Sequence, residues 1–305
     1  MKKSSSSSRY SNDYLNYDIL VRIFMTLSTA ELLVVPLVCK SWMQASRSPS
    51  LWNKLDLTTL HSSIHNVPKI RNTWNDICSQ RKLDLLLKFG VRLGGGGNIR
   101  CLIFNYYVYL SDFHLITAAE RTPNLRRLVF PDSGYLSKDG IYNAMRLWGG
   151  LVSMTITSIV NRPYMFSAIG KYCKNLSQLK LTFNFEQRHA DALVKHTPNL
   201  MILSIRDVTV NLRALCHVLK NMERLLLVNI CHSITIWDRP DGSIVLYEVK
   251  SLTNHLSISC LKKIISCEVN GFCRCQRPNY DPRRHPDEKF EDIWRYDEVT
   301  CLGID

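Results

Sequence analysis

Apolar residues between positions 15 and 27 follow the 3.6-residue spacing of an α-helix, with polar residues between them. The positions on the apolar face are Leu15, Ile19, Leu20, Ile23, Phe24 and Leu27. Residues 28–31 form a capping box, which predicts that a second, short helix begins there and ends near Pro36. A third helix is expected over residues 37–46, followed by a buried segment that ends at Leu57.

Three helices this short enclose too little volume for all the large apolar side chains that they carry. Some of that apolar surface must therefore meet another chain or the rest of this one. We expect Ile23, Leu27 and Trp52 to hold the helices together, and Leu15 and Trp42 to lie at an interface.

The order of residues in this segment resembles an F-box, through the stretches LNYDILVRIF (15–24), VCKSW (38–42) and SPSLWNKLDL (48–57). The resemblance implies that the segment docks on the Skp-family adaptor of a cullin-RING ubiquitin ligase. Carried over by position, the residues expected at this contact are Leu15, Ile19, Leu20, Phe24, Leu32, Val38, Cys39 and Trp42. One residue departs from the family pattern: Asn16 stands where a proline usually follows the first leucine, and asparagine is a good helix cap.

Six segments in the middle of the chain follow the form L-x-x-L-x-L. Their first members are Ile99, Leu125, Leu151, Leu176, Leu200 and Met222, at intervals of 26, 26, 25, 24 and 22 residues. These intervals fall within the repeat length of leucine-rich repeats, roughly 20–29 residues. Apolar helical segments separate the units, and one unit cannot bury its leucines alone, so the units are expected to stack into a curved solenoid.

Alternation along each predicted strand indicates which side chains point to the concave face of the solenoid. Three columns of side chains cross the units, and their charged members are Arg127, Lys180, Arg206 and Arg224. These charges suit an acidic protein substrate, and ordinary solvated strand positions explain them equally well. A small-molecule site in the solenoid stays open, since the sequence shows no pocket chemistry for one.

These patterns divide the chain into a tail, a three-helix F-box, a linking helix region, about six repeats, a helical cap and a second tail. The expected ranges are residues 1–11, 12–57, 58–98, 99–235, 236–267 and 268–305. The fold class is therefore α/β, with parallel strands on the concave face and helices on the convex face. The glycines at 94–97 are expected to form a flexible loop before the first repeat. The CRCQR (273–277) and RYDEV (295–299) stretches are similar to those of plant F-box/leucine-rich-repeat proteins, which extends the resemblance over nearly the whole chain.

Composition narrows the class of protein. The 305 residues are 46% hydrophobic and 21% charged, which is typical of a folded chain. The 39 Lys and Arg against 26 Asp and Glu give a net charge of +13, but the basic residues are scattered, so we expect no nucleic-acid partner. No apolar run approaches the ~20 residues of a membrane span, and the first residues do not resemble a signal peptide. The eleven cysteines are expected to be reduced, which favours the nucleus or cytoplasm.

No catalytic or cofactor motif is recognisable, so we expect neither an enzyme nor a cofactor. The four-glycine run lacks the Gly-Lys-Ser/Thr ending of a phosphate-binding loop. Cys267, Cys273 and Cys275, with His285 downstream, do not have the spacing of a structural zinc site, so no metal is expected. Cys173 and Cys231 are expected to pack as small apolar groups.

The sequence thus predicts the substrate-recognition subunit of an SCF-type E3 ubiquitin ligase. Its F-box would bind the Skp-family adaptor and, through it, the cullin-RING scaffold, while the repeats would bind a protein substrate. Two alternatives stay open: a leucine-rich-repeat scaffold or inhibitor that engages no ligase, which Asn16 favours, and a nucleic-acid binder, which the net charge of +13 favours.

Overall fold

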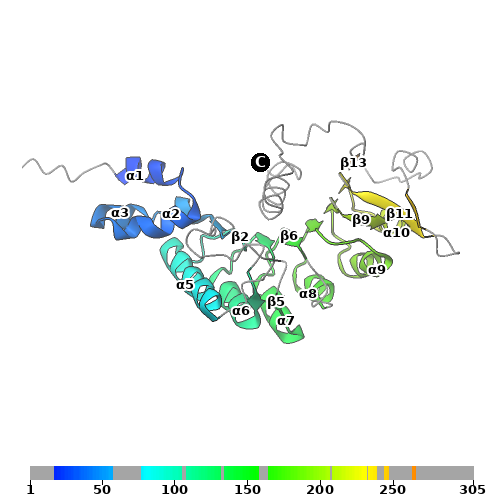
Figure 1. Cartoon of the computed structure of the whole chain (residues 1–305), viewed down its shortest axis with the longest axis horizontal. Helices are drawn as coiled ribbons and strands as arrows, with labels where there is room; N and C mark the ends of the chain where they lie inside the picture. Colours follow the sequence, from blue (N-terminus) through cyan, green and yellow to red (C-terminus); the bar gives the residue numbers. More distant parts are fainter. Residues whose placement is uncertain are drawn as a thin grey trace, which may run out of the picture.

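The computed structural model describes residues 17–57, 77–104, 108–131, 134–157, 164–206, 208–231, 233–238, 244–246 and 263–265. In these ranges a helical N-terminal unit continues into an arch of strands, with helices along the outer side of the arch (Figure 1). The expectations for Leu15, for Asn16, for both tails and for Cys267, Cys273, Cys275 and His285 lie outside the described residues.

The N-terminal unit contains three α-helices and two 3₁₀ turns. In chain order its elements are α1 (Tyr17–Phe24), α2 (Thr29–Val34), η1 (Val35–Leu37), α3 (Lys40–Ala45) and η2 (Pro49–Trp52). The predicted capping box is confirmed: the Ser28 hydroxyl accepts from the Glu31 backbone N–H, and the Glu31 carboxylate accepts from the Ser28 backbone N–H at 2.7 Å. Helix α2 ends before Pro36, which lies in η1, so the third helix begins at Lys40 rather than at residue 37.

Eight parallel strands form the concave side of the arch. In their spatial order they are β1 (Lys54–Asp56), β2 (Cys101–Ile103), β4 (Arg127–Val129), β6 (Ser153–Ile156), β7 (Gln178–Leu181), β8 (Ile202–Ser204), β10 (Leu227–Asn229) and β13 (Lys263–Ile265). The predicted α/β class with parallel strands is confirmed.

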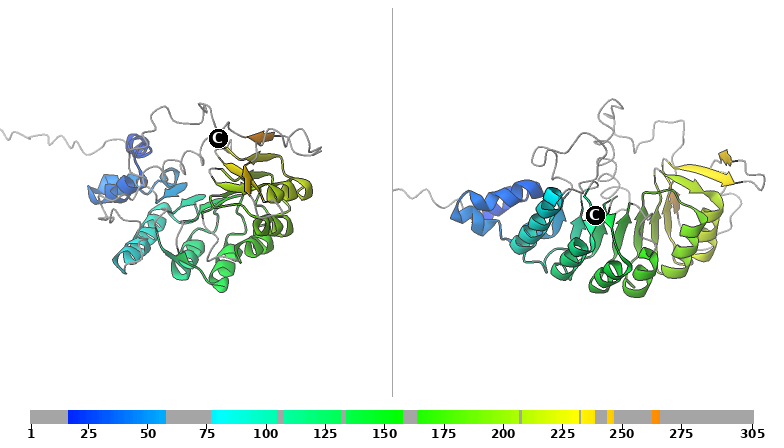
Figure 2. Two further views of the ribbon diagram at one scale, coloured as in Figure 1. Left: turned by 45° about the vertical axis from the view of Figure 1, so that its right-hand side comes forward. Right: turned by 60° about the horizontal axis from the view of Figure 1, so that its bottom comes forward.

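Helices pack side by side along the outer side of this sheet (Figure 2). They are α5 (Ile77–Gly94), α6 (Asp112–Arg121), α7 (Lys138–Leu147), α8 (Met165–Tyr172), α9 (Gln187–His196) and α10 (Leu212–Asn221). Two smaller sheets accompany the main one: β3 (Leu110–Ser111) with β5 (Gly134–Tyr135), and β12 (Ile244–Leu246) with β11 (Ile234–Asp238) and β9 (Thr209–Asn211).

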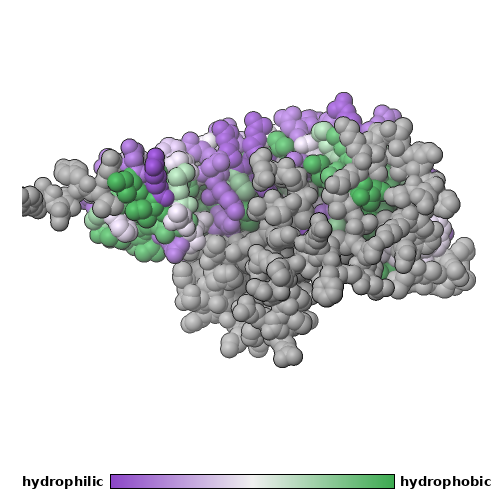
Figure 3. Space-filling model, turned by 90° about the horizontal axis from the view of Figure 1, so that it is seen from above, coloured by the Kyte–Doolittle hydropathy of each residue, from purple (hydrophilic) through white to green (hydrophobic). Residues whose placement is uncertain are grey.

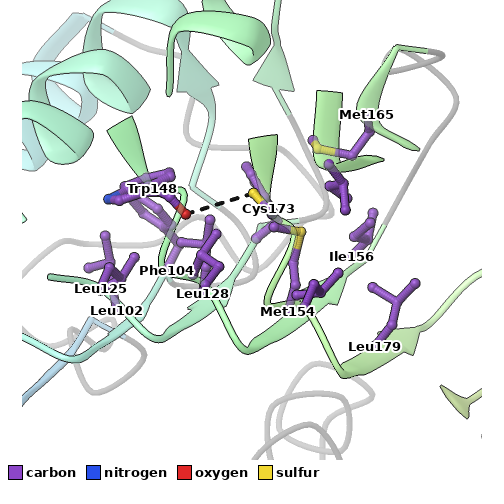
Figure 4. Close-up of a cluster of buried hydrophobic side chains, with 14 of the residues drawn as sticks. Leu102, Phe104, Leu125, Leu128, Trp148, Met154, Ile156, Met165, Cys173 and Leu179 are labelled. Atoms are coloured by element: carbon purple, nitrogen blue, oxygen red, sulfur yellow. Dashed lines mark hydrogen bonds between the residues drawn. The ribbon is translucent and has the colours of Figure 1, made fainter. Parts of the chain in front are cut away.

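One continuous hydrophobic core runs between the sheet and the helices, from the F-box helices to the last repeats. Leu102, Leu128, Met154 and Leu179 occupy the same position on successive strands and are buried (Figure 4). Each such side chain contributes roughly 1.5–3 kcal/mol when it is removed from water. Stacking of neighbouring units therefore stabilises the solenoid.

Trp148, which follows the end of α7, and Cys173, which follows the end of α8, are buried in this core. The indole N–H of Trp148 donates to the carbonyl oxygen of Thr122 at 3.2 Å and to its hydroxyl at 3.1 Å, so a polar atom is satisfied within an apolar layer. The Sγ of Cys173 lies 3.7 Å from the Trp148 carbonyl oxygen (Figure 4). Cys173 is buried within the hydrophobic core, which confirms that it packs as a small apolar group. Cys231 is also buried but is not part of that core, so the same expectation for it stays a prediction.

The sheet begins one unit earlier than the sequence indicated. Trp52, Leu55 and Leu57, expected as a buried segment at the end of the F-box, have the L-x-x-L-x-L spacing and are fully buried. Strand β1 pairs with β2 so that Leu55 lies beside Leu102. The F-box and the solenoid therefore share one core, and the expectation that Trp52 packs internally is confirmed.

The sixth unit is shifted by three residues from the predicted register. Val228 lies beside Leu203, so the anchors of this unit are Leu225, Val228 and Ile230 rather than Met222, Leu225 and Leu227. Met222 instead follows the end of α10, and the Leu225 backbone N–H donates to its carbonyl oxygen. The corrected interval from Leu200 to Leu225 matches the earlier ones. Both registers place apolar residues on the pattern, so only the pairing with β8 distinguishes them.

The C-terminal end of the described sheet also differs from expectation. A capping helix was predicted there, but Ile264 and Ile265 lie in strand β13, which pairs parallel with β10. An added strand satisfies the exposed backbone groups of the last repeat directly. The other residues expected in that helix, Leu252, Leu256 and Leu261, lie outside the described residues.

The glycines at 94–97 form a tight junction rather than a flexible loop. Gly95 and Gly96 have φ values of +67° and +47°, a left-handed conformation that ends α5. A Cβ on Gly94 would lie 2.6 Å from the Cβ of Trp52, and one on Gly96 would collide with the Arg121 carbonyl oxygen. Glycine thus lets α5 pack against the end of the F-box and against the first repeat, as the predicted linking helix requires.

Candidate functional site

Apolar side chains remain exposed on the N-terminal helical unit although its interior is filled. We call this group the apolar face; its members are Tyr17, Ile19, Ile23, Met25, Val34, Leu37, Val38 and Met43. Leu37 is 78% exposed and Val38 is 59% exposed. Hydrophobic side chains gather at this end of the molecule (Figure 3). Exposed apolar groups clustered on a folded unit are typical of a protein–protein contact.

Helix periodicity separates the apolar face from the core. On α1, Leu20 and Phe24 lie four residues apart and are buried, while Ile19 and Ile23, also four apart, are exposed. The expectation that Ile23 holds the helices together is therefore wrong. Leu27 packs against the core, as expected.

The residues predicted to contact the adaptor divide into exposed and buried sets. Ile19, Val38 and Cys39 are exposed at the surface of the F-box helices. Leu20, Phe24 and Leu32 are buried and differ from the expectation, because a side chain enclosed in the helical core offers little surface to a second chain. These three residues hold α1 and α2 in place.

Trp42 belongs partly to each set. It is half-buried, and its ring meets the Phe24 ring edge-on, with the ring centroids 5.3 Å apart. Its substitution would therefore disturb the packing of α1 on α3 as well as any contact made by its exposed part. Leu37 is the better probe of the surface because most of its side chain touches no other part of the described chain.

The concave columns keep the predicted register through the fifth unit. Lys180 lies beside Thr155 on one strand and Ser204 on the other, between the inward-facing Leu179 and Leu181. The alternation of the strands is therefore as expected. The exposure of the cations differs from the expectation: Lys180 is 2% exposed and Arg206 is 5% exposed, whereas the sequence predicted side chains that a substrate or solvent could reach. Alternation indicates the face of a sheet but not what covers that face.

Of the other two predicted substrate contacts, Arg127 lies on the concave face and Arg224 does not. Arg127 begins β4 beside Ser153 and Cys101, on the concave face and partly exposed. Arg224 lies in the turn before β10, where its guanidinium donates to the Oδ1 of Asn199 at 3.0 Å. The prediction that Arg224 lies on the concave face is wrong, and the cause is the register of the sixth unit.

Two buried titratable side chains, Cys173 and His189, contribute to the packing of the repeats. Burial raises the pKa of the Cys173 thiol to about 12, so the thiol stays protonated and unreactive at neutral pH. Burial and the neighbouring Arg188 lower the pKa of His189, whose Nδ1 accepts from the Glu186 backbone N–H at 3.1 Å. Within the described ranges, no group of three or more His, Cys, Asp or Glu side chains could hold a metal ion.

The fold and the apolar face define a class of protein that joins other proteins, an F-box followed by a leucine-rich-repeat solenoid. Residues 17–58 match the family model described as F-box-like. The chain is 36% identical over 297 residues to an F-box/LRR-repeat protein of Arabidopsis thaliana, which covers 95% of each chain. A second F-box protein of that plant is 26% identical over 326 residues, 94% of this chain and 95% of its own. F-box protein FBW2 of the same plant is 29% identical over 168 residues, 54% of this chain and 48% of its own.

The chain therefore belongs to the plant F-box/leucine-rich-repeat proteins. Its general role is that of a substrate adaptor of SCF-type ubiquitin ligases, and its F-box implies binding to a Skp-family adaptor. Proteins of this family are typically adaptors without catalytic activity of their own. Among the helices that the structure describes, none combines the length and the apolar character needed to cross a membrane.

Proposed function

We propose that this chain is the substrate-recognition subunit of an SCF-type E3 ubiquitin ligase that docks through the apolar face and holds a protein substrate on the solenoid. The observation that carries the docking proposal is the exposure of Leu37 and Val38 on a unit whose core is already filled. In the described part of the F-box, Leu20, Phe24 and Leu32 fill the interior while Leu37 and Val38 face outward, so a second chain is the partner that they suit.

A few residues are expected to supply most of the affinity. Interfaces commonly depend on a small number of central, well-buried anchors surrounded by contacts of little energetic weight. Leu37 is the first candidate, because burying a leucine side chain is worth roughly 1.5–3 kcal/mol. Ile19, Val38 and Cys39 are the other exposed members of the set that the sequence predicted. Leu15 remains a candidate by position in the sequence.

The chain itself performs no bond-making step in this proposal. Docking at one end and substrate binding at the other convert the meeting of the substrate and the charged conjugating enzyme into an intramolecular event. The continuous core between the F-box and the repeats supports this role, because it holds the two surfaces in a fixed relation. Ubiquitin transfer then takes place between the partners.

The concave face is the proposed substrate surface. Arg127 is partly exposed there and suits an acidic substrate. Lys180 and Arg206 lie on the same face but are buried, so Arg127 is the cation of this face that we assign to the substrate.

Co-expression with a Skp-family adaptor, followed by gel filtration, tests the docking proposal. The wild-type chain is expected to elute as a one-to-one complex, and Leu37→Asp is expected to elute alone, because a carboxylate cannot be buried unpaired in an apolar contact. Leu147→Asp is the matched control: Leu147 is also exposed but lies at the end of α7, outside the F-box. A Leu37→Asp chain that keeps the complex, or a wild-type chain that forms none, contradicts the proposal.

The competing function is a leucine-rich-repeat scaffold or inhibitor without ligase engagement. The departure at Asn16 is the sequence feature that favours it. Absence of a complex with the wild-type chain would support it, and recovery of the complex by Asn16→Pro would identify that departure as the cause.

A further inference from the structure

Cationic side chains gather along one lateral edge of the solenoid. The strands of the main sheet run parallel, so the C-terminal ends of the outer helices and the turns that lead into the next strands lie at the same edge. We call the exposed cations there the basic edge: Arg92, Arg100, Arg121, Arg126, Arg146, Lys171, Lys174, Lys195, Lys220 and Arg224.

Helix stabilisation explains only part of this edge. A cation in the last turn of a helix stabilises its negative end by about 0.3–1 kcal/mol, and α5 to α10 each carry at least one. Lys174, just after α8, donates to the Gly170 carbonyl oxygen and so also serves a helix end. Arg100, Arg126 and Arg224 lie outside the helices and bond to turns of neighbouring repeats instead. The positive charge therefore exceeds what the helix ends require.

The charge of the edge is not neutralised by carboxylates of its own. The same helix ends and turns contain two acidic residues, Glu120 and Glu223, and both are exposed. Within the ranges that the structure describes, no cation of the basic edge forms an ion pair with a carboxylate. The edge therefore presents an uncompensated positive field.

Some of these cations are held in position. Arg100 donates through Nη1 to the Asn124 carbonyl oxygen at 3.1 Å, and Arg126 donates in the same way to Gly150 at 3.2 Å, one repeat further on. Each bond fixes one nitrogen of the guanidinium and leaves its other N–H groups for a partner. Less side-chain entropy is then lost when an anion binds.

The dimensions of the edge fit an extended chain. Neighbouring helices in such a stack lie ~10 Å apart, so the helices α5 to α10 span roughly 50 Å. An extended polypeptide rises ~3.3 Å per residue, and about 15 residues cover that distance. Carboxylates along such a segment could meet a cation at each repeat, and arginine binds carboxylates with paired hydrogen bonds.

We propose that the basic edge binds an extended, acidic segment of a protein partner, and this partner is the substrate if the proposed function holds. A nucleic acid is the competing polyanion. Binders of single strands stack bases on exposed aromatic rings, and the described part of the edge offers the half-buried Tyr172. Readers of duplex DNA insert a helix into a groove, whereas α5 to α10 pack side by side along the arch (Figure 2).

Fluorescence anisotropy with a labelled 15-residue glutamate-rich peptide tests this inference on the full chain alone, so that the result does not depend on the adaptor. The triple variant Arg146→Gln, Lys195→Gln, Lys220→Gln removes three edge cations without adding a charge that opposes the helix ends. The matched control, Lys138→Gln, Arg188→Gln, Arg213→Gln, removes three cations from the first turns of α7, α9 and α10, at the opposite edge. Circular dichroism establishes that both variants are folded.

The inference predicts that the edge variant weakens peptide binding by about tenfold or more, that the control changes it by less than about twofold, and that added salt weakens it. Equal weakening in both variants would show non-specific attraction and overturn the inference, as would no binding by the wild-type chain at low salt. Tighter binding of a single-stranded or duplex DNA of equal charge would also overturn it. Adaptor binding by the same edge variant shows separately whether the proposed function stands.

Discussion

Single residues of the F-box separate into those that hold it together and those left for a partner. Leu20 and Ile19 are adjacent in sequence and have similar side chains, yet the first is buried and the second is 49% exposed. The resemblance to the family placed both residues in the docking set. A match of residue type does not distinguish a side chain that contacts the partner from one that only supports the helix. The positions of the helices resolve this difference.

Cysteine reactivity provides a residue-level prediction for the docking surface. Cys39 is exposed beside Val38, whereas Cys173 is buried with its pKa raised to about 12. A maleimide at pH 7.5 is therefore expected to label Cys39 rapidly and Cys173 hardly at all, because the thiolate is the reactive form. Saturation with a Skp-family adaptor is expected to slow labelling of Cys39, as peptide mapping by mass spectrometry would measure. Unchanged labelling of Cys39 in a confirmed complex would place the contact elsewhere.

The concave face shows how far residue-level prediction reaches. Strand alternation correctly indicated that Lys180 points away from the core of the sheet, because that property depends on the local backbone alone. The burial of the same side chain could not be predicted, since it depends on contacts made across the whole fold.

At the scale of single elements, the sequence predicted helix and strand positions correctly where they depend on interactions between residues close in the chain. The capping box at Ser28 and Glu31 predicted the start of α2, because both hydrogen bonds lie within four residues. The repeat pattern predicted the strands of five units for the same reason. The register predicted for the sixth unit was wrong, because Leu225 fits the pattern in two registers and the pairing of Val228 with Leu203 joins segments far apart in sequence.

Helix α9 carries a pH-dependent element. The His189 ring is buried, and its Nδ1 can accept from the Glu186 N–H only while it is unprotonated. Its folded pKa is lowered, so the stabilisation is present above the unfolded value of about 6.5 and is lost as the pH falls below it.

The urea midpoint of unfolding is therefore expected to drop between pH 7.5 and pH 5.5. His189→Gln, which keeps a polar side chain without a titration in this range, is expected to show a smaller drop. If the variant and the wild-type chain lose the same stability over this interval, His189 is not the cause.

At the scale of the whole molecule, the decisive feature is that the F-box is continuous with the solenoid. Trp52, Leu55 and Leu57 belong at once to the end of the F-box and to the first strand of the sheet. Both modules could be predicted from the sequence, but their junction could not. Trp52 stands where the repeat pattern has a leucine, so this first repeat was not recognised, and the glycines at 94–97 resembled a flexible loop. A rigid junction fixes the distance between the two binding surfaces, which an adaptor of this kind requires.

The affinity of the full chain for a purified Skp-family adaptor, measured by isothermal titration calorimetry, tests the central claim most directly. Leu37→Ala is expected to weaken binding by about tenfold or more, which corresponds to about 1.4 kcal/mol, and Leu147→Ala by less than about twofold. Trp42→Ala is expected to lose more than ~2 kcal/mol of affinity, and a thermal melt would separate this loss from the destabilisation of the Phe24 contact. Wild-type affinity in a folded Leu37→Ala chain, or no heat of binding with the wild-type chain, would contradict the account.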